Sequence, residues 1–121
     1  MNTAVQLYTL RAVDEPTAKL IERVGETSLD GVEFAGAPVE DGIADALAET
    51  DLTAFAAHVD ASRIERSIEE IVEACEAVDC ATVVVPYLDE SHFADREAVV
   101  ETADRLETLA DLLESHGMRL C

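Results

Sequence analysis

Five side chains able to bind hydroxyl groups or exchange protons lie at or near the ends of short β-type runs. They are Gln6, Tyr8, Glu33, His58 and Tyr87. Carboxylate and imidazole groups can exchange protons with a bound molecule, and amide and phenol groups form hydrogen bonds with hydroxyls. These residue types indicate recognition of a small polar molecule, provided that the fold brings the ends of the runs together.

Glu33 is the most informative of the five, because it lies between Val32 and Phe34 in a run that otherwise suits a buried strand. An unpaired buried carboxylate is costly, so Glu33 needs a partner, a metal or a proton. One interpretation is a pocket carboxylate that binds a substrate hydroxyl. The other is a structural ion pair, with Arg11 as the available cation.

His58 ends the third β-type run and has the same strand parity as Ala54 and Ala56, whose small side chains would leave room beside it. It could bind substrate, carry a proton or ligate a metal. The other histidines, His92 and His116, fall in a loop and at a helix end. We therefore favour pocket lining over metal binding for His58.

The remaining candidates are less specific. In the first run Gln6 and Tyr8 share one face, opposite Val5 and Leu7, so they either bind substrate or form a satisfied interior polar pair. Tyr87 follows the fourth run and either reaches the rim of a pocket or packs against its neighbours.

Four helical segments alternate with the strands that would position these residues. The predicted strands are Ala4–Tyr8, Gly31–Ala35, Leu52–His58, Ala81–Tyr87 and a fifth that begins at Met118. Apolar residues at helical spacing form four stripes between the strands, at Leu20–Val24 after Pro16, Ile43–Leu47, Ile64–Val78 and Val99–Leu113. Asp60 or Ser62 is expected to cap the third helix, and Gly117 to take the left-handed position after the fourth. The repeat predicts one α/β domain over residues 1–121, with parallel strands joined by helical crossovers.

The charge is strongly acidic, with 27 Asp and Glu against 8 Lys and Arg, a net charge of −19 and Lys19 as the single lysine. Repulsion on such a surface weakens in concentrated salt, and the composition resembles that of proteins from salt-accumulating cytoplasms.

There is no basic footprint for nucleic acid, no long apolar run for a membrane and no signal-peptide pattern. The three cysteines suggest no disulfide framework. We expect a cytoplasmic protein.

Five segments, in order, resemble the first five strands of the xylose isomerase-like barrels, the family of sugar phosphate isomerases/epimerases. They are Gln6–Arg11 (QLYTLR), Asp30–Phe34 (DGVEF), Ala56–Asp60 (AAHVD), Cys80–Pro86 (CATVVVP) and Gly117–Leu120 (GMRL). A complete (β/α)8 barrel usually needs roughly 250 residues. The resemblance therefore implies the N-terminal half of a TIM barrel, with four βα units and the start of strand five.

The resemblance also implies a function. In this family a divalent metal (Mn, Mg, Co or Zn) polarises a sugar, sugar phosphate or cyclitol while carboxylates transfer a proton through an enediol-type intermediate. The usual ligands follow strands five to eight, so the metal is expected in the complete parent enzyme and not in this chain. The five side chains named first would line the substrate pocket. We expect no catalytic or metal-ligating residue here and no activity from this chain alone.

Two alternatives stay open. One is a stand-alone binding or signalling module with a flavodoxin-like sheet, which would place helices on both faces. The other is an obligate half-barrel that assembles with a copy of itself or with a separate C-terminal half, without catalysis of its own.

Overall fold

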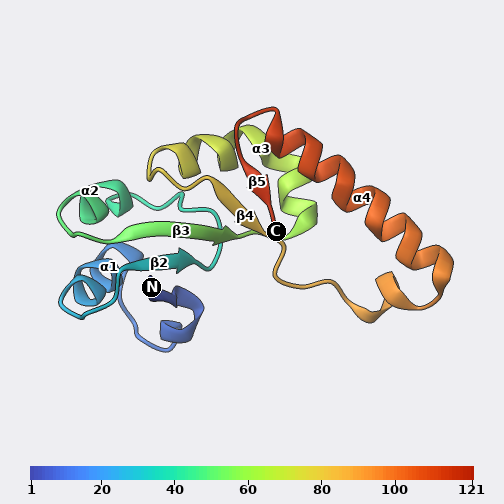
Figure 1. Ribbon diagram of the computed structural model, residues 1–121. Helices are drawn as coiled ribbons and strands as arrows, with labels where there is room; N and C mark the ends of the chain where they lie inside the picture. Colours follow the sequence, from blue (N-terminus) through green and yellow to red (C-terminus); the bar gives the residue numbers. More distant parts are fainter.

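The computed structural model describes all residues, Met1–Cys121, and contains one parallel sheet of five strands in the order β1-β2-β3-β4-β5. The strands are β1 (Ala4–Gln6), β2 (Gly31–Phe34), β3 (Thr53–His58), β4 (Thr82–Val84) and β5 (Arg119–Leu120). The helices between them are α1 (Thr17–Gly25), α2 (Ile43–Ala48), α3 (Ala61–Glu76) and α4 (Arg96–Glu114). Short 3-10 helices, η1 (Leu7–Leu10) and η2 (Glu90–Phe93), follow β1 and precede α4 (Figure 1).

The strand order decides between the competing architectures. Each strand pairs in parallel with the next one along the chain, and the order never reverses. Crossovers of one hand then place all helices on the same face of the sheet. A doubly wound sheet needs a reversal in strand order, so the flavodoxin-like alternative is wrong. The fold is half of a (β/α)8 barrel, as the sequence predicts.

The hydrophobic core lies between the sheet and its helices. Val32 and Phe34 of β2 are 0% and 2% exposed, and Ile21 of α1 is fully buried on the same side. Ile64 and Ile71 of α3 are also fully buried. Helical spacing of these apolar residues is what turns one face of each helix toward the sheet. No helix combines the length and hydropathy that a membrane span requires.

The second and third strands differ from the prediction by one residue each, and the first and fourth are shorter by more than one residue. The first ends at Gln6 instead of Tyr8, because the Gln6 side chain accepts a hydrogen bond from the backbone N–H of Tyr8 and begins η1. The fourth ends at Val84 instead of Tyr87, and Pro86, which has no backbone N–H, cannot extend the ladder. Both tyrosines therefore lie outside the strands that were expected to position them.

The helix ends confirm one expectation and correct another. Gly117 has φ of 75°, its N–H donates to the Glu114 carbonyl, and the Met118 N–H donates to the Leu113 carbonyl, which together close α4 as predicted. At the start of α3, Asp60 occupies the N-cap position, but its side chain makes no capping bond. Ser62 lies inside the helix, so it is not the cap either.

Candidate functional site

A Glu33–His58 pair brings together two of the predicted site residues. Glu33 of β2 and His58 of β3 approach to 2.9 Å between Oε2 and Nε2. A carboxylate only accepts hydrogen bonds, so Nε2 carries the proton and donates it. The side chains are 35% and 19% exposed, which leaves both within reach of a small molecule.

Sheet register explains why these two residues meet. Glu33 pairs with Ala56 across β2 and β3, and His58 lies two residues further along the same strand. The neighbours of Glu33, Val32 and Phe34, are buried in the core on the helix side. Because side chains alternate along a strand, Glu33 points away from the helices and toward the inner face. His58 ends β3 on that same face.

A register shift lies immediately below the pair and corrects one expectation. Val32 pairs with Ala54 and Glu33 with Ala56, so Phe55 is an extra residue between them. Ala54 therefore packs in the helix-side core with Val32, instead of lying on the inner face below His58. The prediction of two small inward residues is right for Ala56 and wrong for Ala54.

The partner of Glu33 is His58, and the expected ion pair with Arg11 is wrong. The Arg11 guanidinium carbon lies 4.4 Å from the centre of the Tyr8 ring, and Nη1 donates to the Tyr8 carbonyl at 3.0 Å. No carboxylate lies within ion-pair distance of Arg11. The turn that η1 makes after Gln6 holds Arg11 on Tyr8, and strand spacing in the sequence does not reveal that turn.

The other predicted site residues lie in different settings. Gln6 is the register partner of Glu33, which puts it beside the pair, but its side-chain oxygen is already bonded to the Tyr8 N–H. Tyr8 is 59% exposed in η1, and Tyr87 is 71% exposed beyond the end of β4. None of the three hydrogen bonds to Glu33 or His58. Their roles in substrate binding stay predictions.

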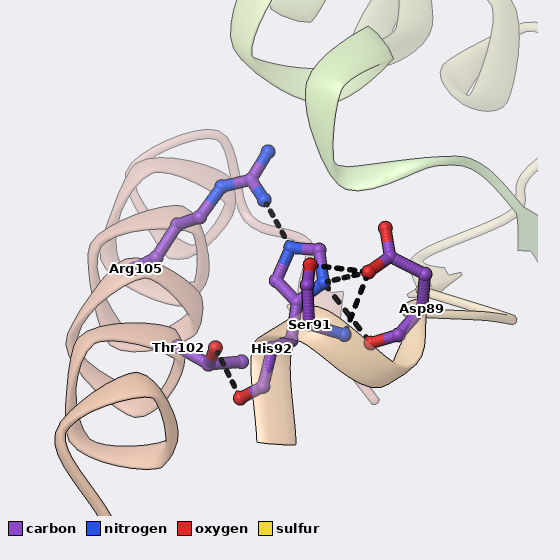
Figure 2. A network of polar contacts seen from close by, with 5 residues as sticks. All are labelled: Asp89, Ser91, His92, Thr102 and Arg105. Carbon is purple, nitrogen blue, oxygen red and sulfur yellow. Dashed lines mark hydrogen bonds and ion pairs between the residues drawn. The ribbon is translucent and has the colours of Figure 1, made fainter. Parts of the chain in front are cut away.

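A second polar cluster occupies the segment between β4 and α4. Figure 2 shows His92 between Asp89 and Arg105, with Nδ1 3.2 Å from the Asp89 carbonyl oxygen and Nε2 3.5 Å from Arg105 Nη1. Thr102 donates to the His92 carbonyl at 3.1 Å. Hydrogen bonds from Ser91 hold the pKa of Asp89 below its ordinary value. These contacts fasten η2 to α4, which extends past the strands in Figure 1.

The Asp89 cluster contains serine, histidine and aspartate but lacks the geometry of a nucleophile. The Ser91 hydroxyl donates to the Asp89 carboxylate, and no bond joins it to His92. A nucleophilic serine needs its base within hydrogen-bond reach. The sequence carries a sign of this arrangement, since an aspartate two residues before a serine is typical of a capped turn. The cluster is a structural brace.

The residues of this chain do not fit a complete site for a divalent metal. No three His, Cys, Asp or Glu side chains come together in an arrangement that could hold an ion. Glu33 and His58 supply two donor groups, and these already bond to each other. A site built from protein groups alone, such as the three or four ligands of zinc, would need further ligands on this face.

Comparison with known proteins identifies the architecture. No protein-family model matches the sequence, and no curated protein matches it. Several solved structures match, and three of them cover 99% of the chain. They are an AP endonuclease of family 2 from Brucella melitensis (TM-score 0.70, 23% identity), the probable 3-DHS dehydratase AsbF from Bacillus anthracis (0.79, 12%) and the 3-keto-D-glucoside 4-epimerase YcjR from E. coli (0.64, 19%).

The extent of these matches shows how much of a barrel is present. The chain covers 54%, 51% and 55% of the three solved chains, so it spans about half of their length. The chain therefore has the fold of half of a TIM barrel.

Proposed function

We propose that this chain is the substrate-binding half of an isomerase/epimerase-type barrel enzyme that acts on a sugar, sugar phosphate or cyclitol. The fold supports this proposal, as do the names of two structural neighbours, a 3-keto-D-glucoside 4-epimerase and a probable 3-DHS dehydratase. The observation that carries it is the Glu33–His58 pair on the inner face, at the end of β3. Barrel enzymes bind their substrates at that end of the strands.

The pair suits a molecule with several hydroxyl groups. His58 Nε2 donates to Glu33 Oε2, and the other carboxylate oxygen, Oε1, makes no hydrogen bond within the protein. In the neutral ring, Nδ1 of His58 is likewise an acceptor. These two acceptors, on neighbouring strands, match two hydroxyl donors of a sugar or cyclitol. Binding through both would hold the carbon skeleton across β2 and β3.

The proposed chemistry is proton transfer through an enediol-type intermediate, with this chain holding and orienting the substrate hydroxyls. The divalent metal of the complete enzyme (Mn, Mg, Co or Zn) would take its ligands from outside Glu33 and His58. Its chemistry is the polarisation of a hydroxy-carbonyl group. In this assignment, the groups that move the proton at carbon also belong to the other half of the barrel.

A second half is part of the proposal because β1 and β5 each pair with one neighbour. Parallel barrels close by pairing every strand on both sides. The partner half would come from a longer chain, from a separate polypeptide or from a second copy. Sedimentation in concentrated salt distinguishes a self-assembling half-barrel from a monomer that needs another partner.

Binding of sugars, sugar phosphates and cyclitols to this chain tests the proposal. We expect Glu33→Gln and His58→Gln each to weaken binding about tenfold, equivalent to about 1.4 kcal/mol. The double variant should bind no more weakly than the weaker single variant, because both substitutions disrupt one site. Saturation-transfer NMR and calorimetry give the dissociation constants.

The matched control is Glu73→Gln, which removes a carboxylate from the exposed side of α3. This substitution should leave the dissociation constants unchanged. If none of these compounds binds to the wild-type chain, or if the control weakens binding as much as Glu33→Gln, the pair is not a substrate site.

A further inference from the structure

Arg11 is an unpaired cation in a chain whose net charge is −19. Four of the eight basic side chains form ion pairs with carboxylates, namely Lys19, Arg23, Arg63 and Arg105. Arg11 forms none, although acidic residues outnumber basic ones more than threefold. Among the unpaired arginines, it is the one that both lines a cleft and is held in place by neighbouring groups.

Contacts with Tyr8 fix the orientation of the guanidinium. The plane lies over the Tyr8 ring, with the central carbon 4.4 Å from the ring centre, and Nη1 donates to the Tyr8 carbonyl at 3.0 Å. Nε and Nη2 make no hydrogen bond within the protein. These two nitrogens form the edge that donates two parallel bonds to a carboxylate or a phosphate. The side chain is therefore preorganised, with its anion-binding edge free.

The cleft beside Arg11 has a volume of about 320 Å³. One wall is the segment after β1, including Leu10 and Val13, and the other is the loop after β2, including Gly36 and Pro38. Both loops follow the carboxyl ends of strands, the end at which barrels carry their sites. Gly36 has φ of 134°, which suits glycine alone, and no atom lies within 4 Å of the place where a Cβ would be.

Two carboxylates also line this cleft, and both have other partners. Glu15 pairs with Arg23 at 2.5 Å between Oε1 and Nη2. Glu40 accepts from the Thr17 hydroxyl at 2.9 Å and, at 3.4 Å, from the Thr17 N–H at the start of α1. The other oxygen of Glu15, Oε2, is buried and has no hydrogen-bond partner. Neither carboxylate forms an ion pair with Arg11, because Glu15 is paired with Arg23 and Glu40 is bonded to Thr17.

We propose that this cleft is a subsite for a carboxylate or phosphate group, bound by the Nε and Nη2 edge of Arg11. The assignment of this anionic group to the substrate rests on the proposed function. If the assignment holds, the substrate is a sugar phosphate or a sugar acid. Binding of a simple oxyanion in the cleft does not depend on the proposed function. The two proposals can therefore fail separately.

Titration of the full chain with inorganic phosphate and with acetate, at constant ionic strength set by KCl, tests the subsite. The Nε–H signal of Arg11 in NMR spectra should shift and saturate with at least one of the two anions. Tighter binding of phosphate indicates a sugar phosphate, and tighter binding of acetate indicates a sugar acid. Glu33→Gln should leave this binding intact, which separates the subsite from the Glu33–His58 pair.

Arg11→Gln should weaken anion binding about tenfold or more. Arg11→Lys, which keeps the charge but loses the paired donors, should weaken it to a smaller extent. The control is Arg66→Gln, which removes the same charge from an exposed, unpaired arginine on α3. Absence of saturable binding by either anion overturns the proposal. Equal losses in Arg11→Gln and Arg66→Gln also overturn it, because they would reflect net charge alone.

Discussion

At the residue scale, Gly31 determines how closely β2 and β3 approach below the Glu33–His58 pair. A Cβ at this position would lie 2.2 Å from the Thr53 carbonyl oxygen and 2.4 Å from the Phe55 ring. The first neighbour is backbone, which cannot move without shifting β3. Glycine inside a strand often marks such a close approach, and here it accompanies the register shift that presents Glu33 to His58.

Replacing Gly31 with alanine should lower the free energy of unfolding by about 1–3 kcal/mol, the usual cost of overpacking. Urea unfolding followed by circular dichroism measures the change. Gly25→Ala is the control, because the added Cβ would meet the Thr50 side chain at 2.7 Å instead of backbone. The control should cost less. If Gly31→Ala is as stable as the wild type, β3 can move away from β2 without cost, and the close approach at Gly31 does not contribute to stability.

At the scale of elements, Arg105 joins the two longest helices. Its Nε and Nη2 donate to Glu65 of α3 at 2.6 Å and 3.0 Å, a bidentate contact. Arg105 also approaches His92 of η2, so one side chain of α4 connects α3 with the polar cluster of Figure 2. The hydrogen bond from Arg105 holds the pKa of Glu65 below its ordinary value.

This shift makes part of the stability dependent on pH. Because the pKa of Glu65 is lower in the folded state, its contribution is present above the unfolded value, about 4.3, and is lost as the pH falls through the folded value. When the pH is lowered from about 5.5 to about 3, the free energy of unfolding should therefore fall less in the Glu65→Gln variant than in the wild type. Urea unfolding at both pH values gives the comparison.

Glu107→Gln serves as the control for this experiment, since Glu107 is exposed on α4 and has no ion pair. It should retain the acid sensitivity of the wild type. If Glu65→Gln also retains it in full, the Arg105–Glu65 contact does not stabilise the packing of α3 against α4.

At the scale of the whole molecule, the net charge of −19 governs how stability responds to salt. Carboxylates spread over the helix faces repel one another, and repulsion between exposed charges opposes the compact state. The screening length falls from about 10 Å at 0.1 M salt to about 3 Å at 1 M. Most of this repulsion therefore acts over distances that concentrated salt screens.

Raising KCl from about 0.1 M to about 1 M should increase the melting temperature by at least about 4 °C, the shift that 1 kcal/mol produces in a domain of this size. Differential scanning calorimetry provides the measurement. The same salt increase should have a much smaller effect close to the sequence isoelectric point of about 4.1. A melting temperature that falls with salt at neutral pH would show that the ion pairs outweigh the repulsion.

The sequence by itself determined the alternation of strands and helices in this protein, because helical periodicity and buried strand runs are local properties, whereas the strand order that excludes a flavodoxin-like sheet came from the structure. The spacing of Leu20, Ile21 and Val24 in α1 and the position of Gly117 after α4 follow directly from the sequence. Glu33 and His58 could be named as candidate pocket residues from their places in the predicted strands. Their mutual contact could not be predicted, because it depends on pairing between separate segments.

Only the tertiary structure decided the details of the sites. A register shift at Phe55 turns Ala54 into the core, and the turn after Gln6 moves Arg11 away from Glu33 and onto Tyr8. Both depend on how one segment packs on another, which periodicity does not encode. The sequence alone therefore predicted one substrate pocket lined by the five candidate residues. The structure places the Glu33–His58 pair and the cleft beside Arg11 apart, and we propose hydroxyl binding at the first and anion binding at the second.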